Sequence, residues 1–375
     1  MEHTFTANIK SILDNKFGTD SDEIFRNSNL IQYINFKTRS ANKGSKARSS
    51  FANLYAIYVL VEDYLDNHFV QKGTYSEYEG AIYSKLFIRQ RQLPFGGSLQ
   101  NHALNNRMNA EFKKYFPTSD IIPILRKLET NRYWINENLL KIKVGKNDYN
   151  LSYVIIEIIE EYTKTKQDSF QRFIKACEEL QEIEGSNPDR VIEFISGLLA
   201  PNVDARLFEI VSYSILKFHY HYQNIFWGFE IDSLTKENLK LYKTGRTNAN
   251  DGGIDFVMKP IGRFFQVTET LDFKKYFLDI DKIQKFPITF VIKSDEAIEK
   301  LLIKIKVNAN KIYLVTAIVD KYMGCIEEVI NIPILKLRFS DSIKLGYLNN
   351  ILNEIITQSK VEFNYTDTAE LDEEE

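Results

Sequence analysis

Apolar and polar residues follow two different patterns along the chain, and the change comes near residue 200. In the first part, apolar side chains recur every three or four residues, which is the spacing of amphipathic or buried helices. These helices are expected over residues 51–69, 100–114, 120–140, 168–184 and 188–199. A strand pair is expected at residues 139–144 and 149–156, around a polar Gly-Lys-Asn-Asp turn.

After residue 200, short apolar runs alternate with helical patterns. Helices are expected over 205–222, 274–285, 296–306 and 344–356, and strands over 226–231, 252–258, 264–270, 288–294 and 311–319. Such alternation favours an α/β domain with a central mixed sheet flanked by helices. The expected organisation is therefore a mainly helical domain, residues 1–200, an α/β domain, residues 201–365, and an acidic tail, residues 366–375.

Composition narrows the class of protein. Apolar residues make up 44% of the 375 residues and charged residues 26%, which excludes an intrinsically disordered chain. Two cysteines, Cys177 and Cys325, cannot form a disulfide framework. The N-terminus lacks the apolar segment of a signal peptide, and no apolar run is long enough to span a membrane. We therefore expect a cytoplasmic protein without a membrane partner.

The net charge of −3 hides an uneven distribution. Residues 1–150 carry 21 Lys and Arg against 15 Asp and Glu, whereas the rest of the chain is acidic. Basic residues gather in two segments: one holds Lys37, Arg39, Lys43, Lys46 and Arg48, and the other is residues 85–114. These segments are either ordinary solvated surfaces or contacts to phosphates, and the amide and aromatic residues among them favour phosphates.

Three oxygen-bearing residues are expected to converge in the α/β domain. Asp255 begins a strand after two glycines, and Gln266 lies on the next strand, so the two can be neighbours in a hairpin. Glu209 lies on the helix before these strands. Two carboxylates and an amide oxygen suit Mg²⁺, which prefers hard oxygen ligands and binds substrate phosphates. The alternative is structural: Asp255 caps a turn and Gln266 hydrogen-bonds within the sheet.

A family resemblance rests on these residues. The sequence NDGGID at residues 250–255, followed by Gln266-Val267-Thr268 and preceded by Phe208-Glu209, resembles the PD-(D/E)XK nuclease superfamily, especially its Mrr-like branch. The resemblance covers about seventy residues. It implies Mg²⁺-dependent hydrolysis of a phosphodiester, with Asp255 as the metal-bridging carboxylate, Gln266 as a second metal or water ligand, and Glu209 as the accessory acid.

One position departs from the family pattern. The family has a lysine where this chain has Thr268, and a hydroxyl cannot supply the positive charge that orients the attacking water. Glu269 is expected to point to the opposite face of the strand. The replacement could come from a neighbouring segment, and the basic side chains that lie there are Lys243, Arg246, Lys259, Lys274 and Lys275.

The predicted helix at residues 100–114 is unusually rich in amides. Asn and Gln pair with adenine and Arg with guanine, so we expect this helix to read DNA bases. The candidate DNA-binding residues are Arg39, Lys43, Lys46, Arg48, Asn101, His102, Asn105, Asn106, Arg107 and Arg246. A polar, solvated helix with capping amides is the alternative.

The helical part joined to a nuclease core resembles a type II restriction endonuclease, with segments similar to the HaeII-like group. This resemblance implies cleavage of double-stranded DNA at short palindromic sites, a two-fold homodimer, and a cognate DNA methyltransferase as genetic partner. Two further hypotheses stay open. One is a Mrr-like or repair nuclease acting on modified or branched DNA; the other is a DNA-binding protein with an inactive nuclease core, which Thr268 suggests.

Overall fold

The computed structural model describes residues 2–39, 47–97, 99–183, 185–244, 254–269, 273–313 and 315–363. The chain forms two units, Met1–Arg172 and Phe173–Glu375. The division falls inside helix α8 (Ser152–Ile183), whereas the sequence pattern places it near residue 200. The end of α8 joins the second unit because its buried Cys177 and Leu180 pack in that unit's core.

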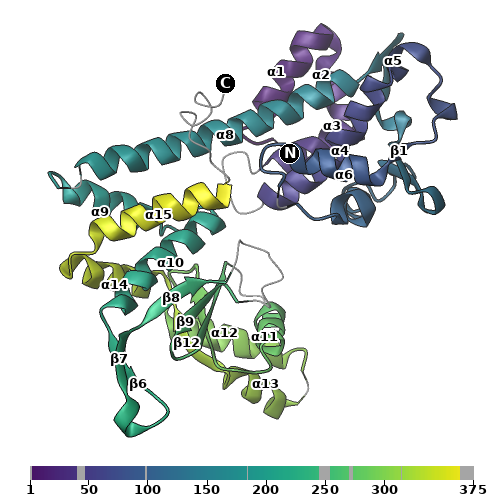
Figure 1. Ribbon diagram of the computed structural model, residues 1–375. Coiled ribbons are helices and arrows are strands. Elements are labelled where there is room, and N and C mark those ends of the chain that lie inside the picture. Colours follow the sequence, from purple (N-terminus) through teal and green to yellow (C-terminus); the bar gives the residue numbers. More distant parts are fainter. Residues whose placement is uncertain are drawn as a thin grey trace. The chain divides into compact units, whose positions relative to one another are not determined.

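Unit 1 is mainly helical, with small antiparallel sheets (Figure 1). Its helices are α1 (Thr6–Phe17), α2 (Ser21–Asn27), α3 (Asn29–Thr38), α4 (Ala47–Asp66), α5 (Phe69–Lys72), α6 (Tyr83–Gln92), a π-helical turn (Ala103–Arg107), α7 (Met108–Tyr115) and the start of α8. Its strands are β1 (Ala81–Ile82), β2 (Ile124–Lys127), β3 (Arg132–Ile135), β4 (Lys141–Val144) and β5 (Asn147–Asn150).

Helix α4 is the centre of unit 1. Every residue from 51 to 61 is buried, so this helix is covered on all sides, as its nearly continuous apolar sequence predicts. Helices α3 and α6, strand β3 and the π-helical turn all contact it. The predicted buried helix is confirmed, and it is the scaffold on which the amide-rich segment is held.

The helix expected over residues 120–140 is wrong. Strands β2 and β3 occupy this segment and pair antiparallel, with β1 on the other side of β3. In β3, Tyr133 and Ile135 are buried whereas their neighbours are only partly covered. This two-residue alternation is the pattern of a half-buried strand. The short apolar runs therefore follow the two-residue period of a strand and not the helical period expected.

Unit 2 contains a five-stranded mixed sheet in the order β12-β11-β10-β9-β8. Its strands are β8 (Lys240–Lys243), β9 (Phe256–Lys259), β10 (Arg263–Thr268), β11 (Ile288–Ile292) and β12 (Ile326–Ile330). Strands β10, β11 and β12 run parallel, and β9 is antiparallel to both of its neighbours. The sequence-based expectation of a mixed α/β fold is confirmed.

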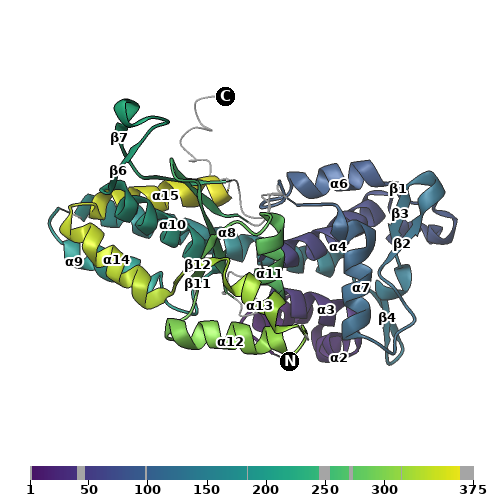
Figure 2. The ribbon, with the colours of Figure 1, turned by 90° about the horizontal axis from the view of Figure 1, so that it is seen from below.

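Helices cover both faces of this sheet, so unit 2 has three layers (Figures 1 and 2). One face packs on α10 (Ala205–His221), α14 (Ile332–Lys344) and α15 (Leu348–Phe363). The other packs on α11 (Phe273–Lys282), α12 (Ile298–Asn310) and α13 (Thr316–Met323). Strand β11 is buried throughout, with Phe290 and Val291 in opposite cores, as expected for a parallel strand covered on both sides.

Three other elements of unit 2 complete the description. Helix α9 (Pro188–Gly197) follows α8, and strands β6 (Asn224–Trp227) and β7 (Thr235–Asn238) form a separate hairpin. The strand expected at residues 311–319 is wrong, because helix α13 begins at Thr316 and β12 follows it instead. None of the described helices has the length and apolarity that a membrane crossing requires.

Candidate functional site

One edge of the five-stranded sheet brings the predicted residues of unit 2 together. Strands β8, β10 and β11 all end at this edge, and β9 begins there. Strand ends at the carboxyl edge of an α/β sheet are the usual position of ligand sites, because the loops that leave them are free to vary. The candidate site is built from the last residues of these strands and from helix α10.

Asp255 and Gln266 are neighbours, as predicted. The backbone N–H of Asp255 donates to the Phe265 carbonyl at 2.9 Å. The Asp255 carboxylate accepts a hydrogen bond from the backbone N–H of Val267 at 2.6 Å. The side chain thus takes the place of the backbone carbonyl that a longer β9 would present to this N–H. The carboxylate therefore lies where strands β9 and β10 separate, next to the residue that follows Gln266.

The Gln266 side chain is buried and incompletely hydrogen-bonded. It is 7% exposed, and its Nε2 donates to the Val267 carbonyl at 3.2 Å. Its Oε1 is buried and has no hydrogen-bond partner among the described residues. Leaving a buried amide oxygen unpaired costs about 1–3 kcal/mol, so such an atom calls for a ligand, a water molecule or a cation.

These two side chains fit a hard divalent cation. A carboxylate and an amide oxygen are ligands of the kind that Mg²⁺ takes together with water and substrate phosphate. Asp255 and Gln266 are therefore the residues that would hold the ion. No group of three or more His, Cys, Asp or Glu arranged to hold a metal occurs within the described ranges.

Thr268 does not face an open site. It is 3% exposed, and its hydroxyl shares a hydrogen bond with the Tyr276 phenol of helix α11. Burial raises the pKa of Tyr276, so this phenol stays protonated at neutral pH. The position where the PD-(D/E)XK pattern has a lysine is therefore occupied by a neutral, buried pair of hydroxyls.

Glu209 lies on α10 and is paired with a lysine from the sheet. Asp204 caps this helix by accepting from the backbone N–H of Arg206, and Glu209 follows one turn later. The Lys243 Nζ lies 3.0 Å from the Glu209 carboxylate, and both side chains are about one-tenth exposed. Lys243 pairs in register with Phe256, the residue after Asp255. Of the proposed lysine replacements, Lys243 therefore lies at the same sheet edge as Asp255, and its side chain faces α10.

The other candidate replacements differ in position. Lys259 pairs with Lys240 at the opposite end of β8 and β9, so it is remote from this edge. Lys274 and Lys275 are exposed on α11. Arg246 lies outside the described residues. Lys243 is joined to Glu209, a predicted site residue, by an ion pair.

A second ion pair at the same edge, between a buried lysine and an exposed glutamate, was not predicted. Lys293, directly after β11, is 3% exposed in its side chain and lies 2.6 Å from the Glu269 carboxylate. Its Nζ also hydrogen-bonds to the Val203 carbonyl and lies 5.8 Å from the Phe208 ring. The signal in the sequence was a lysine directly after a short, mostly apolar strand, at the carboxyl edge of a parallel sheet.

The two ion pairs and the Asp255–Gln266 pair belong to strands that begin or end at the same edge of the sheet. Lys243 is adjacent to the start of β9, and Lys293 is adjacent to the end of β10, since its N–H donates to the Thr268 carbonyl at 2.9 Å. Both ion pairs lie on the α10 side of the sheet, with Phe256 and Phe208, whereas the Gln266 side chain alternates to the α11 side, with Phe290.

No family model matches the chain, and no match is found among curated proteins or solved structures.

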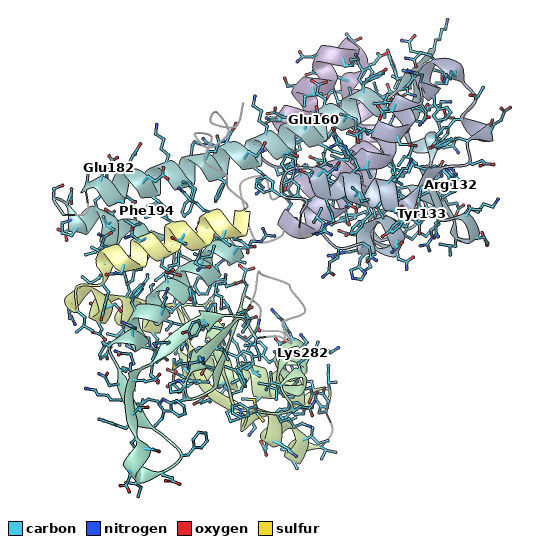
Figure 3. All side chains as sticks on the ribbon, in the orientation of Figure 1. Arg132, Tyr133, Glu160, Glu182, Phe194 and Lys282 are labelled. Atoms are coloured by element: carbon cyan, nitrogen blue, oxygen red, sulfur yellow. The ribbon has the colours of Figure 1, made fainter. Side chains whose placement is uncertain are left out.

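The amide-rich segment in unit 1 is divided between packing and surface. Residues 103–107 form a π-helical turn, not the regular helix expected, so side chains four apart do not lie on one face. Asn109 hydrogen-bonds twice to the backbone of Ile124. Asn105 accepts at 3.0 Å from the hydroxyl of Tyr133, a residue of β3 that is labelled in Figure 3. Asn105 thus supports the fold, although it was predicted to contact DNA.

Four predicted DNA-binding residues of this segment are exposed: Asn101, His102, Asn106 and Arg107. Arg39 is exposed after α3. Lys43, Lys46 and the side chain of Arg48 lie outside the described residues.

The two basic segments are less basic at the surface than their sequence indicates. Lys37 is buried, and its Nζ lies 2.6 Å from the Glu111 carboxylate. Arg89 makes two hydrogen bonds to the Glu62 carboxylate, at 2.8 and 2.7 Å. Lys37 is therefore neutralised inside unit 1 and Arg89 is paired at its surface, so phosphate contacts are expected from the other basic residues.

Proposed function

We propose that this chain is a type II restriction endonuclease with a PD-(D/E)XK-like core. It would hydrolyse double-stranded DNA at a short palindromic site with Mg²⁺. The observation that carries the proposal is the pairing of Asp255 with Gln266 at the carboxyl edge of the sheet, with the buried Gln266 Oε1 left without a partner among the described residues.

The roles follow from the chemistry of each side chain. Asp255 and Gln266 hold the ion, which when bound polarises the scissile phosphate and lowers the pKa of a coordinated water. Glu209 acts as the accessory acid. Its partner Lys243, at the end of the strand next to β9, would supply the positive charge that Thr268 cannot supply.

Unit 1 would hold and read the duplex. The exposed Asn101, His102, Asn106 and Arg107 project around a π-helical turn, a local geometry that is common at functional sites. Amide and guanidinium groups make paired hydrogen bonds to base edges, and Arg39 would contact a phosphate. A palindromic site favours a homodimer, and a methyltransferase of the same specificity would protect the host DNA.

The test is digestion of a supercoiled plasmid with Mg²⁺ in excess over the DNA phosphates. Discrete fragments that share one terminal sequence are expected, and sequencing of the ends defines the site. Asp255→Asn should lose cleavage and keep DNA binding. The matched control is Asp189→Asn, which changes an exposed carboxylate on α9 and should cleave like the wild type.

A second candidate is a DNA-binding protein with an inactive core, and the buried Thr268–Tyr276 pair favours it. It predicts tight binding of one sequence without cleavage by any variant. A Mrr-like or repair nuclease would cleave only methylated or branched substrates. Parallel digestions of unmodified, methylated and branched DNA therefore distinguish the three functions.

A further inference from the structure

A hairpin arm projects from unit 2 and exposes large apolar side chains. It consists of β6, β7 and the tip between them, and it forms its own two-stranded sheet, apart from the five-stranded one (Figure 1). Phe226 is 67% exposed, Phe229 98% and Ile231 86%. Trp227 and Leu234 are 40% and 47% exposed. A two-stranded hairpin is marginally stable by itself, so an arm of this kind normally has a partner.

The tip of the arm has a specific conformation. A Cβ at Gly228 would lie 2.8 Å from the Ser233 carbonyl, so only glycine fits this turn. The Ser233 hydroxyl bonds to the backbone N–H and carbonyl of Glu230, at 3.2 and 3.0 Å. The Trp227 ring packs edge-on against Phe229, with centroids 6.4 Å apart. The fold thus fixes the tip while it leaves the apolar side chains in solvent, which is typical of a docking element.

The charge of the arm limits what it can bind. Residues 224–238 contain Glu230, Asp232 and Glu237 but a single basic residue, Lys236. Acidic side chains around the apolar tip repel DNA phosphates and anionic membrane surfaces. The same repulsion opposes the contact of one arm tip with another. The arm therefore suits an apolar protein surface that carries positive charge.

Unit 2 itself carries such a surface on α12 and α13. Ile303 and Val307 are 61% and 48% exposed on α12, and Ile312, Val315 and Ile318 are 52%, 53% and 42% exposed after it. Lys300 and Lys311 continue the stripe of Ile303 and Val307 at helical spacing, and both are exposed. This α12–α13 face pairs exposed aliphatic side chains with lysines, which complements the arm in both polarity and charge.

We propose that the arm of one chain docks on the α12–α13 face of a second copy of this chain, and that the second copy returns the same contact. Such a two-fold exchange is closed, so it produces a dimer and not a filament. The apolar tip covers Ile303 and Val307, while Glu230 and Asp232 approach Lys300 and Lys311. A second copy of this chain is chosen as the partner because the proposed function expects a dimer. The contact itself requires neither DNA nor metal.

The first test measures the mass of the full chain by sedimentation, without DNA or Mg²⁺. The wild type should be a dimer, and Phe229→Ser with Ile231→Ser should raise the dissociation constant at least about tenfold, as loss of central apolar anchors does. Ile303→Ser with Val307→Ser should have the same effect. Leu337→Ser, at a position 61% exposed on α14, is the matched control and should stay dimeric.

The second test identifies the contact by a disulfide. A chain with Ile231→Cys is mixed with a chain with Val307→Cys under mild oxidation; the native Cys177 and Cys325 are buried. A covalent dimer that forms only in the mixture supports the proposal. Equal crosslinking of the Ile231→Cys chain with itself would overturn it in favour of contact between arms. A wild-type monomer at every concentration, or an arm variant that loses only DNA affinity, would also overturn it.

These outcomes are separate from those of the proposed function. A chain that dimerises through the arm and cleaves no DNA refutes the nuclease and keeps the dimer. A chain that cleaves DNA as a monomer refutes the dimer contact and keeps the nuclease.

Discussion

The ion pair between Lys243 and Glu209 offers the sharpest test of the site's energetics. Lys243→Met keeps the length of the side chain and removes its charge, which leaves Glu209 buried without this partner. At 3.0 Å and an effective dielectric constant of about 20, the attraction between the two charges is about 5 kcal/mol before desolvation is subtracted. Removing one member of a buried ion pair lowers the free energy of unfolding by about 3–5 kcal/mol. Because both side chains are slightly exposed here, we expect Lys243→Met to lower it by about 3 kcal/mol.

A double variant separates the pair from the lysine alone. Lys243→Met together with Glu209→Gln leaves no uncompensated charge, so its cost should fall to about 1 kcal/mol. Lys240→Met is the matched control: it lies on the same strand but is exposed, so its effect should stay within about 0.5 kcal/mol. Cleavage should be lost in both the single Lys243 variant and the double variant, because each lacks the cation proposed to supply the positive charge that Thr268 cannot supply.

Hydrogen exchange, followed peptide by peptide over β10 and β11, measures the stability of unit 2 separately from that of unit 1. The reasoning is refuted if Lys243→Met costs no more than Lys240→Met, or if the double variant is as unstable as the single one. If stability falls as expected but cleavage persists, Lys243 is a structural residue, and Lys293 becomes the residue to test.

Three other predictions concern groups whose environment is well defined. Burial lowers the pKa of His219 to about 4, so the imidazole stays neutral in the folded state while it takes up a proton below about pH 6.5 in the unfolded state. The free energy of unfolding of unit 2 should therefore fall by about 2 kcal/mol, allowing for partial exposure, as the pH drops from 6.5 to 4. His219→Gln should remove this pH dependence in urea titrations. Burial raises the pKa of the Cys177 thiol to about 12, so iodoacetamide should label this residue only under denaturing conditions, as mass spectrometry would detect. Glu111→Gln removes the carboxylate beside Lys37, whose side chain is 7% exposed, and should destabilise unit 1 by about 2–3 kcal/mol in thermal unfolding; an unchanged melting temperature would contradict this burial.

The parts of the fold that the sequence predicts well are those with strong local signals. Helix α4 is apolar on every side, and β9, β10 and β11 are short apolar runs separated by turns and helices. The proximity of Asp255 and Gln266 could be predicted because the two residues belong to a hairpin whose strands are joined by a short loop. In each case the pattern lies within about twenty residues, where local periodicity decides the structure.

The parts that were missed depend on distant residues. Residues 120–140 form β2 and β3 because β1 and α4 pack against them, and nothing in the local pattern shows that partner. Lys37 is withdrawn from the surface by Glu111, which lies 74 residues further along the chain. Lys293 reaches the site through the register of β10 with β11, which the sequence leaves open. Long-range pairing, not propensity, decided these positions.

The account depends most on Asp255, and one comparison tests it directly. Asp255→Asn keeps an oxygen that can accept the hydrogen bond from the Val267 N–H, so the fold should be retained while the charge that holds the cation is lost. Wild type and variant are incubated side by side with the same supercoiled plasmid and Mg²⁺. The account predicts Mg²⁺-dependent cleavage by the wild type and a rate lower by about a thousandfold or more in the variant, since several kcal/mol of charge stabilisation disappear. Equal cleavage by both proteins would contradict the proposed site.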